Sequence, residues 1–344
     1  MLPEVSYRAT AVRPNWPDLP ESLREAISVR LGGPIIAARS AGGGFTRAFA
    51  AVITTKAGFR AFIKAAPLRE PISDWYAREA SITAALPAVV PAGRPRWTMT
   101  HSGYFVLCLD FVDGVVPALP WVTSELEAAV EAWTTAASAL ATPPLSGLPR
   151  LPDIVRAEMS AWSSGTLRAD QPLPPPTPSK PAAPAPSEPA AHSEPAAAAE
   201  PPAVAEPPAV AEPDVLAELV ELERLLPDAV EGSGMLHGDL RVDNVLIDRA
   251  GKAWLCDWTW PCLGAPWFDT VTLLVTAYAS GAEVDRFLAD APAEGVDAAL
   301  AGLAGYWLAR AAGPPSSASP HSRQHQLYSG RAALSWLSAR RGWS

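Results

Sequence analysis

Residues 237–244 read His237-Gly238-Asp239-Leu240-Arg241-Val242-Asp243-Asn244. The amide of Asn244 stands five positions after the carboxylate of Asp239, and a second carboxylate, Asp257, follows thirteen positions after Asn244. Residues 245–258 have the pattern of a β-hairpin that turns at Arg249-Ala250-Gly251-Lys252. The hairpin therefore brings an amide and two acids to one place. These are the groups that hold Mg²⁺ against phosphates and accept the proton of an attacking hydroxyl.

Protein kinases arrange the same residue types in the same order. Their catalytic loop is His-Arg-Asp with an Asn five positions after the Asp, and a metal-binding Asp follows a β-hairpin. Taken separately, His237-Gly238-Asp239 could be a turn and Asp257 a surface acid at the end of a strand. Their order and spacing across a hairpin favour a phosphoryl-transfer site.

On these residues the sequence resembles the aminoglycoside phosphotransferase and choline-kinase-like family, whose fold is bilobal and protein-kinase-like. The family pattern is His-Gly-Asp-x-x-x-x-Asn, then a hydrophobic residue and Asp, then a later Asp that opens a helix. Residues 237–244, residues 256–258 and Asp269 match this pattern. The resemblance covers nearly the whole chain outside a Pro/Ala-rich tract at 171–213.

The resemblance implies an ATP-dependent phosphotransferase that acts on a hydroxyl of a small molecule, such as an aminoglycoside-like or other amine-bearing compound. It implies that Asp239 is the catalytic base and that Asn244 and Asp257 bind magnesium. Asp269 would brace the catalytic loop, with His237 as a further structural support. The cofactors would be ATP and Mg²⁺, although the sequence does not distinguish ATP from GTP.

The predicted fold is α+β, with a small five-stranded N-lobe carrying one inserted helix and a larger, mainly helical C-lobe. Residues 1–110 form the nucleotide-binding lobe and residues 111–344 the catalytic and acceptor-binding lobe. The N-lobe is expected to begin with a helix at 19–31. Its strands are expected at 34–38, 45–54, 59–65, 96–100 and 104–110, with the inserted helix at 74–86. The C-lobe helices are expected at 121–141, 152–163, 214–226, 266–279, 295–312 and 321–340.

Lys64 lies near the end of the third predicted strand, where the kinase signature places the lysine that meets the α- and β-phosphates. Glu79, on the helix that follows, is the candidate partner that orients it. Either residue alone would be an ordinary solvated charge. Their order ahead of the catalytic loop favours a role in nucleotide binding.

Two further segments are candidates for nucleotide contacts. Gly42-Gly43-Gly44 lies between the first two strands, where glycines would let backbone N–H groups approach phosphate, or would simply form a hairpin turn. Cys108-Leu109-Asp110 lies where the connection between lobes would offer backbone groups to the nucleotide base.

Several side chains near the catalytic loop have two interpretations each. Arg241 could steady the charge of the transferred phosphoryl group or be a solvated loop residue. Trp258 and Trp260 could line the acceptor pocket, whereas Trp254 and Trp267 are expected in the core. The His321 and His325 pair has helical spacing without a third ligand, which indicates a solvated face.

The tract at 171–213 contains 15 prolines and 13 alanines and is predicted to be a disordered insertion within the helical lobe. The formal net charge of the chain is −9, which argues against general nucleic-acid binding. Residues 1–113 carry +4, whereas residues 114–170 and 214–344 together carry −9. An acidic acceptor lobe favours a neutral or cationic acceptor.

The chain shows no signal-peptide pattern and no long apolar run, and its three cysteines form no disulfide framework, so we expect a cytoplasmic protein without membrane partners. A protein kinase is a weaker alternative, because only eleven residues separate Asp257 from Asp269 and leave no room for a long activation segment. A catalytically inactive, nucleotide-binding module is the alternative outside the enzymes.

Overall fold

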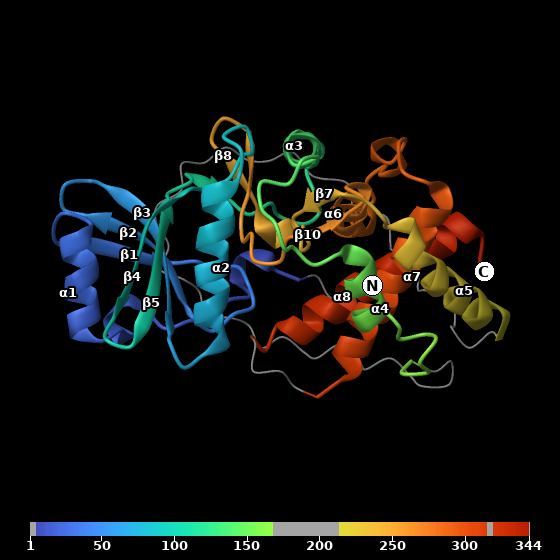
Figure 1. The fold of residues 1–344 in the computed structure, drawn as a ribbon, viewed down its shortest axis with the longest axis horizontal. Coiled ribbons are helices and arrows are strands. Elements are labelled where there is room, and N and C mark those ends of the chain that lie inside the picture. Colours follow the sequence, from blue (N-terminus) through green and yellow to red (C-terminus); the bar gives the residue numbers. More distant parts are fainter. Residues whose placement is uncertain (1–4, 168–212, 315–318, 344) are drawn as a thin grey trace, which may run out of the picture.

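The computed structural model describes residues 5–167, 213–314 and 319–343, and these form a small β-rich lobe and a larger helical lobe (Figure 1). The tract predicted to be disordered at 171–213 lies outside the described residues, except for Pro213 at the start of a helix. Within the described part of the chain, no helix has the length and hydropathy needed to cross a membrane.

The small lobe is built on one antiparallel sheet with the strand order β1-β2-β3-β5-β4. Its strands are β1 (Ile35–Ser40), β2 (Phe49–Thr55), β3 (Arg60–Pro67), β4 (Pro95–His101) and β5 (Tyr104–Asp110). The β3 and β5 strands lie side by side in the sheet, although the helix α2 (Pro71–Ala85) and β4 come between them in the sequence. The five-stranded sheet and the inserted helix are therefore as the sequence predicts.

One helix covers each face of this sheet. The helix α1 (Glu21–Arg30) buries Leu23 and Ile27 against the face that includes Phe49 and Ile53. The helix α2 covers the other face, where Tyr76 packs with Leu107 and neighbouring residues. Burial on both faces explains why β2 and β3 carry nearly continuous apolar runs instead of strict alternation.

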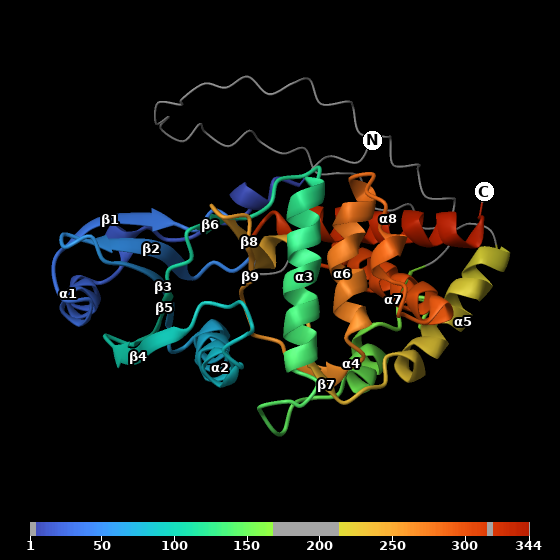
Figure 2. The same cartoon turned by 90° about the horizontal axis from the view of Figure 1, so that it is seen from above.

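The larger lobe contains α3 (Thr123–Ala139), α4 (Leu151–Glu158), α5 (Pro213–Ala229), α6 (Trp267–Ala279), α7 (Ala293–Ala312) and α8 (Ser322–Arg341). In Figure 2 α3 and α6 stand next to each other, and α8 runs across the lobe. The helices α7 and α8 approach closely where Gly330 faces Leu308, since a Cβ at residue 330 would lie 2.7 Å from Leu308 Cγ. These helices form the main hydrophobic core.

Five short strands complete the helical lobe. The hairpin β8 (Val245–Asp248) and β9 (Ala253–Leu255) is present as predicted, and β6 (Gly114–Val115) pairs with β8. The strands β7 (Gly234–Leu236) and β10 (Cys262–Gly264) pair with each other on either side of the hairpin in sequence. This pairing fixes the start of the catalytic loop at residue 237 beside the segment that follows Asp257.

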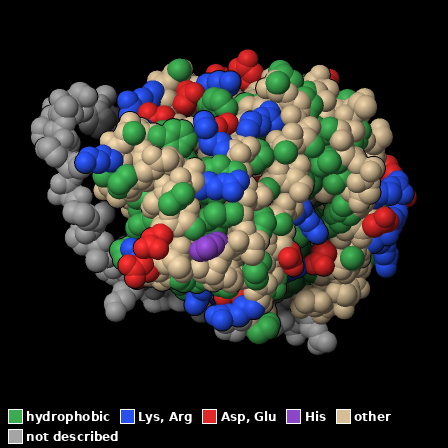
Figure 3. All heavy atoms as spheres, turned by 60° about the vertical axis from the view of Figure 1, so that its left-hand side comes forward, with side chains coloured by type: hydrophobic (Ala, Val, Ile, Leu, Met, Phe, Trp, Pro, Cys, Tyr) green, Lys and Arg blue, Asp and Glu red, His purple; other side chains and the backbone are tan. Residues whose placement is uncertain are grey.

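Charged side chains of both signs lie on the surface around the small lobe. Figure 3 brings the small-lobe side forward, and Lys and Arg side chains are spread among hydrophobic and acidic ones over the visible face. Several aliphatic side chains of this lobe are exposed, including Ile36, which is 64% exposed.

Candidate active site

An ion-pair network joins the two lobes at the position predicted for the phosphates. Lys64 Nζ donates to Glu79 Oε1 and Oε2 at 2.8 and 2.6 Å, and to Asp257 Oδ1 at 3.1 Å. Burial alone would lower the pKa of Lys64, but Asp257 and Glu79 together hold it above its usual value. The lysine is therefore charged and fixed between one acid of the small lobe and one of the large lobe.

Asp257 has a backbone conformation that is rare for a residue with a side chain. Its φ is +64°, in the left-handed region, and such strain is typically found at functional sites. Burial would raise the pKa of its carboxyl, but the charge and hydrogen bond of Lys64 outweigh this and lower the pKa to about 2. The side chain is nevertheless 44% exposed, because it faces the cleft between the lobes.

The catalytic loop presents Asp239 and Asn244 together. Asn244 Nδ2 donates to the backbone oxygen of Asp239 at 2.7 Å, which turns its amide oxygen away from that bond. Arg241 pairs with Asp239 at 2.5 Å and with Asp243 at 3.1 Å, so it is an ion-paired residue of the cleft and not a solvated loop residue. Burial raises the pKa of Asp239 to about 7, although Arg241 opposes this shift.

Asp269, at the start of α6, fixes the start of the catalytic loop through hydrogen bonds to its backbone. Its carboxylate accepts from the backbone N–H of His237 at 2.7 Å and from that of Gly238 at 3.2 Å. Gly238 has φ +77°, and a Cβ there would lie 2.0 Å from the backbone oxygen of Trp260. Glycine is thus required at residue 238 by both conformation and space. His237 Nε2 donates to the backbone oxygen of Cys256 at 3.0 Å, and its ring packs on Trp258.

The glycines between β1 and β2 lie in the connection of an antiparallel strand pair, which is longer than a two-residue hairpin turn. They belong to a loop of residues 41–48, since β1 ends at Ser40 and β2 begins at Phe49. A segment at the N-terminus, residues 5–13, crosses this loop, and a Cβ at Gly42 would lie 2.1 Å from the Arg8 backbone oxygen. Gly42 and Gly43 therefore allow the close passage of another chain segment, whereas Gly44 lines the cleft.

Arg13 is a cation of the cleft that sequence reasoning missed. Its guanidinium donates to the backbone oxygens of Gly43 and Ala48 and to Thr46 Oγ1, each at 3.0 Å. Its Nε is buried without a hydrogen-bond partner, and none of the ion pairs of the described residues includes it. No motif spacing marked it, because it precedes α1 and reaches the site only through folding.

The segment Cys108-Leu109-Asp110 is not the connection between the lobes. It forms the end of β5, where it pairs with β3 on one side and β4 on the other. Cys108 is fully buried in the core beneath α1, and Asp110 pairs with Arg96 at 2.8 Å. Because the sheet already uses this backbone, the connection lies one step later, at residues 111–113.

The four tryptophans near Asp257 are not distributed between the core and the cleft as predicted. Trp258 is completely buried and donates to the backbone oxygen of Leu255, so it belongs to the core. Trp260 is 41% exposed and lines the cleft. Trp254 is half-buried on the hairpin, where it bonds Asp248, and Trp267 is half-buried against the core.

His325 is buried, which corrects the expectation of a solvated histidine face. Its ring lies 2.8 Å from Tyr7 Oη and stacks on Phe45 at 4.8 Å between ring centroids. Burial lowers the pKa of His325 to about 3, so the ring is neutral. His321, one turn earlier, remains partly exposed. The two histidines do lie one turn apart at the start of α8, but the residues that cover His325 include Tyr7 of the distant N-terminal segment and Phe45 of the loop 41–48.

These residues surround a cleft of about 850 Å³ between the lobes. One wall carries Lys64, Trp75 and Tyr76 of the small lobe, and the opposite wall carries residues of α7 and α8. The catalytic loop and residues 257–260 form its floor. The charged side chains that line it are Arg13, Lys64, Asp239, Arg241, Asp243, Asp257, Arg310 and Arg323. The acidic total of the helical lobe therefore does not extend to this cleft.

The oxygen donors at the cleft fit magnesium better than a softer metal. Asp257 and Asn244 lie on adjacent backbone, because Cys256 N–H donates to the Asn244 backbone oxygen at 2.9 Å. A carboxylate and an amide oxygen are hard ligands, and Mg²⁺ typically takes one or two such ligands with the rest from phosphates and water. No group of three or more His, Cys, Asp or Glu among the described residues forms a metal site without phosphate.

Comparison with known proteins gives matches to one family and one fold. A model of the phosphotransferase enzyme family matches residues 38–306. A thermostable mutant of aminoglycoside phosphotransferase APH(4)-Ia, solved with ADP and hygromycin B, aligns at 11% identity and a TM-score of 0.59, covering 93% of this chain and 99% of that one. No curated protein sequence matches the chain.

Two further solved structures share the fold. Choline kinase LicA from Streptococcus pneumoniae aligns at 12% identity and a TM-score of 0.53, with 91% of this chain and 97% of that one covered. A protein from Haemophilus somnus that is described as a putative fructosamine-3-kinase aligns at 10% identity and a TM-score of 0.52, with 92% of this chain and 97% of that one covered. At such identities these structures establish the fold, and the family match establishes the ancestry.

Proposed function

The chain belongs to the phosphotransferase enzyme family and is a small-molecule kinase, and from this premise we propose that it transfers the γ-phosphoryl group of ATP to a hydroxyl of a small molecule. The observation that carries the proposal is the contact of Lys64 with both Glu79 and Asp257. In kinases this lysine must be paired with its helix glutamate while the metal-binding aspartate is in place. Lys64 has this pairing with Glu79 and also contacts Asp257, the candidate metal ligand.

Lys64 and Arg13 are the cations that would bind the phosphates. Both line the cleft beside the loop 41–48, and the Arg13 guanidinium bonds only carbonyl and hydroxyl oxygens there. Asn244 and Asp257 would hold the magnesium ion, which supplies charge neutralisation on the phosphates when bound. APH(4)-Ia was solved with ADP, which agrees with a nucleotide in this cleft.

Asp239 would act on the acceptor. Its carboxylate faces the cleft from the catalytic loop and is held there by Arg241 and Asn244. As the acceptor oxygen forms its bond to phosphorus and the bond to the β-phosphate oxygen breaks, Asp239 accepts the hydroxyl proton. Arg241, 2.5 Å from Asp239, would stabilise the negative charge that develops beside it.

The short chain between Asp257 and Asp269 supports a small-molecule acceptor over a protein. It contains β10 and leads directly into α6, so the described residues include no activation segment there. The net charge of the helical lobe led us to expect a neutral or amine-bearing acceptor. The cleft itself has a different balance of charge, because five Lys and Arg side chains and three acids line it.

The proposal is tested by separating nucleotide binding from turnover. Asp257→Ala should weaken binding of Mg·AMP-PNP, measured by calorimetry, because it removes a metal ligand. Asp239→Asn should keep that binding but lower ADP formation with an accepted hydroxyl compound by about a hundredfold or more, the usual contribution of a positioned base.

Asp153→Asn, at an exposed position of α4, is the matched control and should change neither quantity. Near-normal turnover of Asp239→Asn would contradict the catalytic assignment. Nucleotide binding without turnover on any acceptor would instead identify an inactive nucleotide-binding module.

A further inference from the structure

Each carboxylate in the described lining of the cleft already has a cationic partner. Its described lining contains three acids, Asp239, Asp243 and Asp257. Both oxygens of Asp243 accept from Arg241, and Asp257 accepts from Lys64 and Thr259. Asp239 pairs with Arg241 and is the candidate base. An amine-bearing acceptor needs acids beyond these, because a desolvated ammonium is costly without a partner.

Two arginines occupy the acceptor side of the same cleft. Arg310 stands one turn after Tyr306 on α7, and its guanidinium lies 4.9 Å from the centre of the Tyr306 ring. Arg310 and Tyr306 line the same cleft as Asp239, the candidate base.

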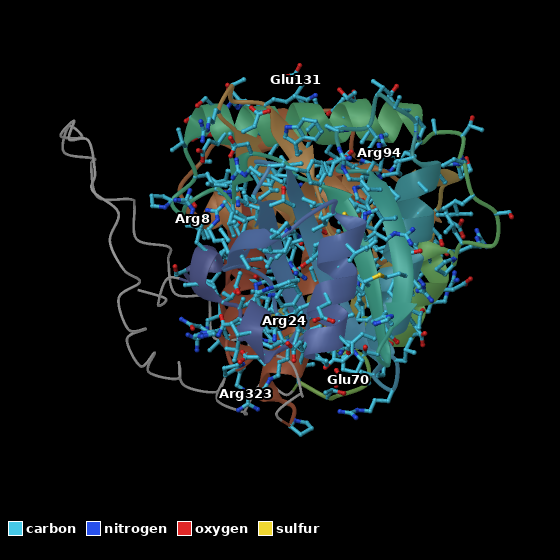
Figure 4. The ribbon with its side chains drawn as sticks, turned by 90° about the vertical axis from the view of Figure 1, so that its left-hand side faces the viewer. Arg8, Arg24, Glu70, Arg94, Glu131 and Arg323 are labelled. Carbon is cyan, nitrogen blue, oxygen red and sulfur yellow. The ribbon has the colours of Figure 1, made fainter. Side chains whose placement is uncertain are left out.

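Arg323, near the start of α8, is the second arginine. Its guanidinium donates to the backbone oxygen of Gly313, and no ion pair among the described residues includes it. In Figure 4, which looks at the small-lobe side, Arg323 lies at the lower edge of the molecule.

Arg310 is paired with Glu158 at 2.7 Å, but both side chains are 50% exposed. Such an exposed pair contributes little and can be exchanged for another anion.

Aromatic side chains supply the rest of the acceptor wall. Trp260 is 41% exposed, and its ring meets Trp75 edge to face at 5.3 Å. Tyr306 and Trp307 face the cleft from α7. A wall of this kind fits the apolar face of a ring, whereas the arginines present planar forks that match carboxylate and phosphate oxygens.

We propose that the acceptor is an anionic hydroxyl compound, whose carboxylate or phosphate group is bound by Arg310 and Arg323 while its ring packs on Trp260 and Tyr306. This inference rests on the proposed kinase function and adds the charge of its substrate. It reverses the charge expected from the whole lobe, because the acids of that lobe lie mostly outside the cleft.

The test uses one sugar scaffold in four charge states, with the full chain loaded with Mg·AMP-PNP. Binding of glucose 6-phosphate, glucuronate, glucose and glucosamine is measured by calorimetry. The phosphate or the carboxylate sugar should bind at least about tenfold more tightly than glucose and glucosamine, and the stronger of the two identifies the anionic group. Glucosamine binding as tightly as both anionic sugars, or no binding of either anionic sugar, would overturn the proposal.

Charge-reversing variants assign the binding to these residues. Arg323→Glu and Arg310→Glu should each abolish the preference for the anionic sugar. Arg224→Glu makes the same charge change on α5, at a 62% exposed position outside the cleft, and should retain it. Mg·AMP-PNP binding should be unchanged in all three variants.

A wild-type protein that does not bind Mg·AMP-PNP would count against the kinase function. A wild-type protein that binds Mg·AMP-PNP but does not prefer the anionic sugars would count against this inference alone. An equal loss in Arg224→Glu would show that only the overall charge matters.

Discussion

Arg13 contributes a positive charge to the small-lobe side of the cleft. It lies beside Gly44, whose Cβ position is 2.7 Å from an Arg13 guanidinium nitrogen. Its hydrogen bonds go to neutral oxygens, so its charge is not balanced by a carboxylate of the described residues. We expect Arg13→Ala to raise the Kd for Mg·AMP-PNP about tenfold or more, the usual effect of losing one charged hydrogen bond.

Arg13→Lys should recover part of this affinity, because it retains the charge without the planar fork. Arg24→Ala is the control, since Arg24 bonds the Leu19 backbone oxygen at the start of α1 and does not line the cleft. Calorimetry reports affinity and thermal melting reports stability. A lower melting temperature with unchanged nucleotide affinity would show that Arg13 only supports the loop.

His325 should make the stability of the protein depend on pH. Burial lowers its pKa to about 3, and Arg241 acts in the same direction while Asp243 opposes it. The unfolded chain, with a pKa near 6.5, binds a proton that the folded chain does not bind. Stability from this residue is therefore complete above pH ~6.5 and falls as the pH drops toward about 3.

The wild type should lose roughly 2 kcal/mol more than His325→Gln between pH 7 and pH 5, from about 1.36 kcal/mol per unit of pKa difference. Urea unfolding of both proteins at each pH measures this difference. The quantity to compare is the change in unfolding free energy between the two pH values in each protein. The variant loses the Tyr7 contact at both pH values, so this loss cancels. Parallel pH dependence in the two proteins would show that His325 is protonated equally in both states.

The site residues that could be predicted from the sequence are those held at fixed spacing by one element. Asp239 and Asn244 share one loop, and Asp257 follows one hairpin, so their juxtaposition depends on local structure. Arg13 and Tyr306 reach the cleft from opposite ends of the chain. No local pattern relates them to the catalytic loop, and only the packed fold brings them together.

At the scale of elements, α7 and α8 approach too closely for a larger residue at Gly330. An added Cβ would lie 2.7 Å from Leu308 Cγ and 3.1 Å from the Leu308 backbone nitrogen. The helices would have to separate, and overpacking of this kind usually costs about 1–3 kcal/mol. We expect Gly330→Ala to lower the free energy of unfolding by that amount, measured by urea denaturation.

Gly33→Ala provides the comparison, because no atom lies within 4 Å of its Cβ position and its φ is not positive. That substitution should leave stability unchanged or raise it slightly by restricting the unfolded chain. If Gly330→Ala were as stable as the wild type, the close approach of α7 and α8 would be wrong.

The longer elements could be predicted from the sequence, and the shortest could not. The helix α3 and the strands β3 and β5 extend over enough residues for their apolar period to be read. The strands β6, β7 and β10 contain two or three residues each, and no period exists over such a length. These strands form because tertiary packing brings their partners together: β7 pairs with β10, and β6 pairs with β8. They connect the catalytic loop to the rest of the lobe.

At the scale of the whole molecule, charge totals do not predict the charge of the cleft. Residues 114–170 and 214–344 carry a net charge of −9, but acids such as Asp153, Glu221 and Asp228 are exposed in pairs with arginines. The cleft instead gathers Arg13, Arg310 and Arg323 among its lining residues. A local field of this sign acts on a small ligand at short range, where screening by salt is weakest.

The two lobes are also connected by contacts of the loop 41–48 and the N-terminal segment with residues 319 and 325. Phe45, in the loop 41–48, stacks on His325, and its backbone oxygen accepts from Ser319 at 2.7 Å. The N-terminal segment adds the bond between Tyr7 Oη and His325, together with Ser319 Oγ donating to the Thr10 backbone oxygen at 2.6 Å. One histidine of α8 therefore anchors two separate segments of the small-lobe side.

This arrangement predicts that the loop 41–48 is held against the helical lobe mainly by Phe45 and Tyr7. Phe45→Ala and Tyr7→Ala should each accelerate amide hydrogen exchange in residues 41–48. Because both side chains contact His325, the double variant should differ from the sum of the single ones by a measurable coupling energy. Trp97→Ala, on β4 and far from α8, should leave exchange in this loop unchanged even if it destabilises the sheet. Unchanged loop exchange in Phe45→Ala would show that the contacts with α8 do not hold the loop, and the N-terminal segment alone would then have to account for its position.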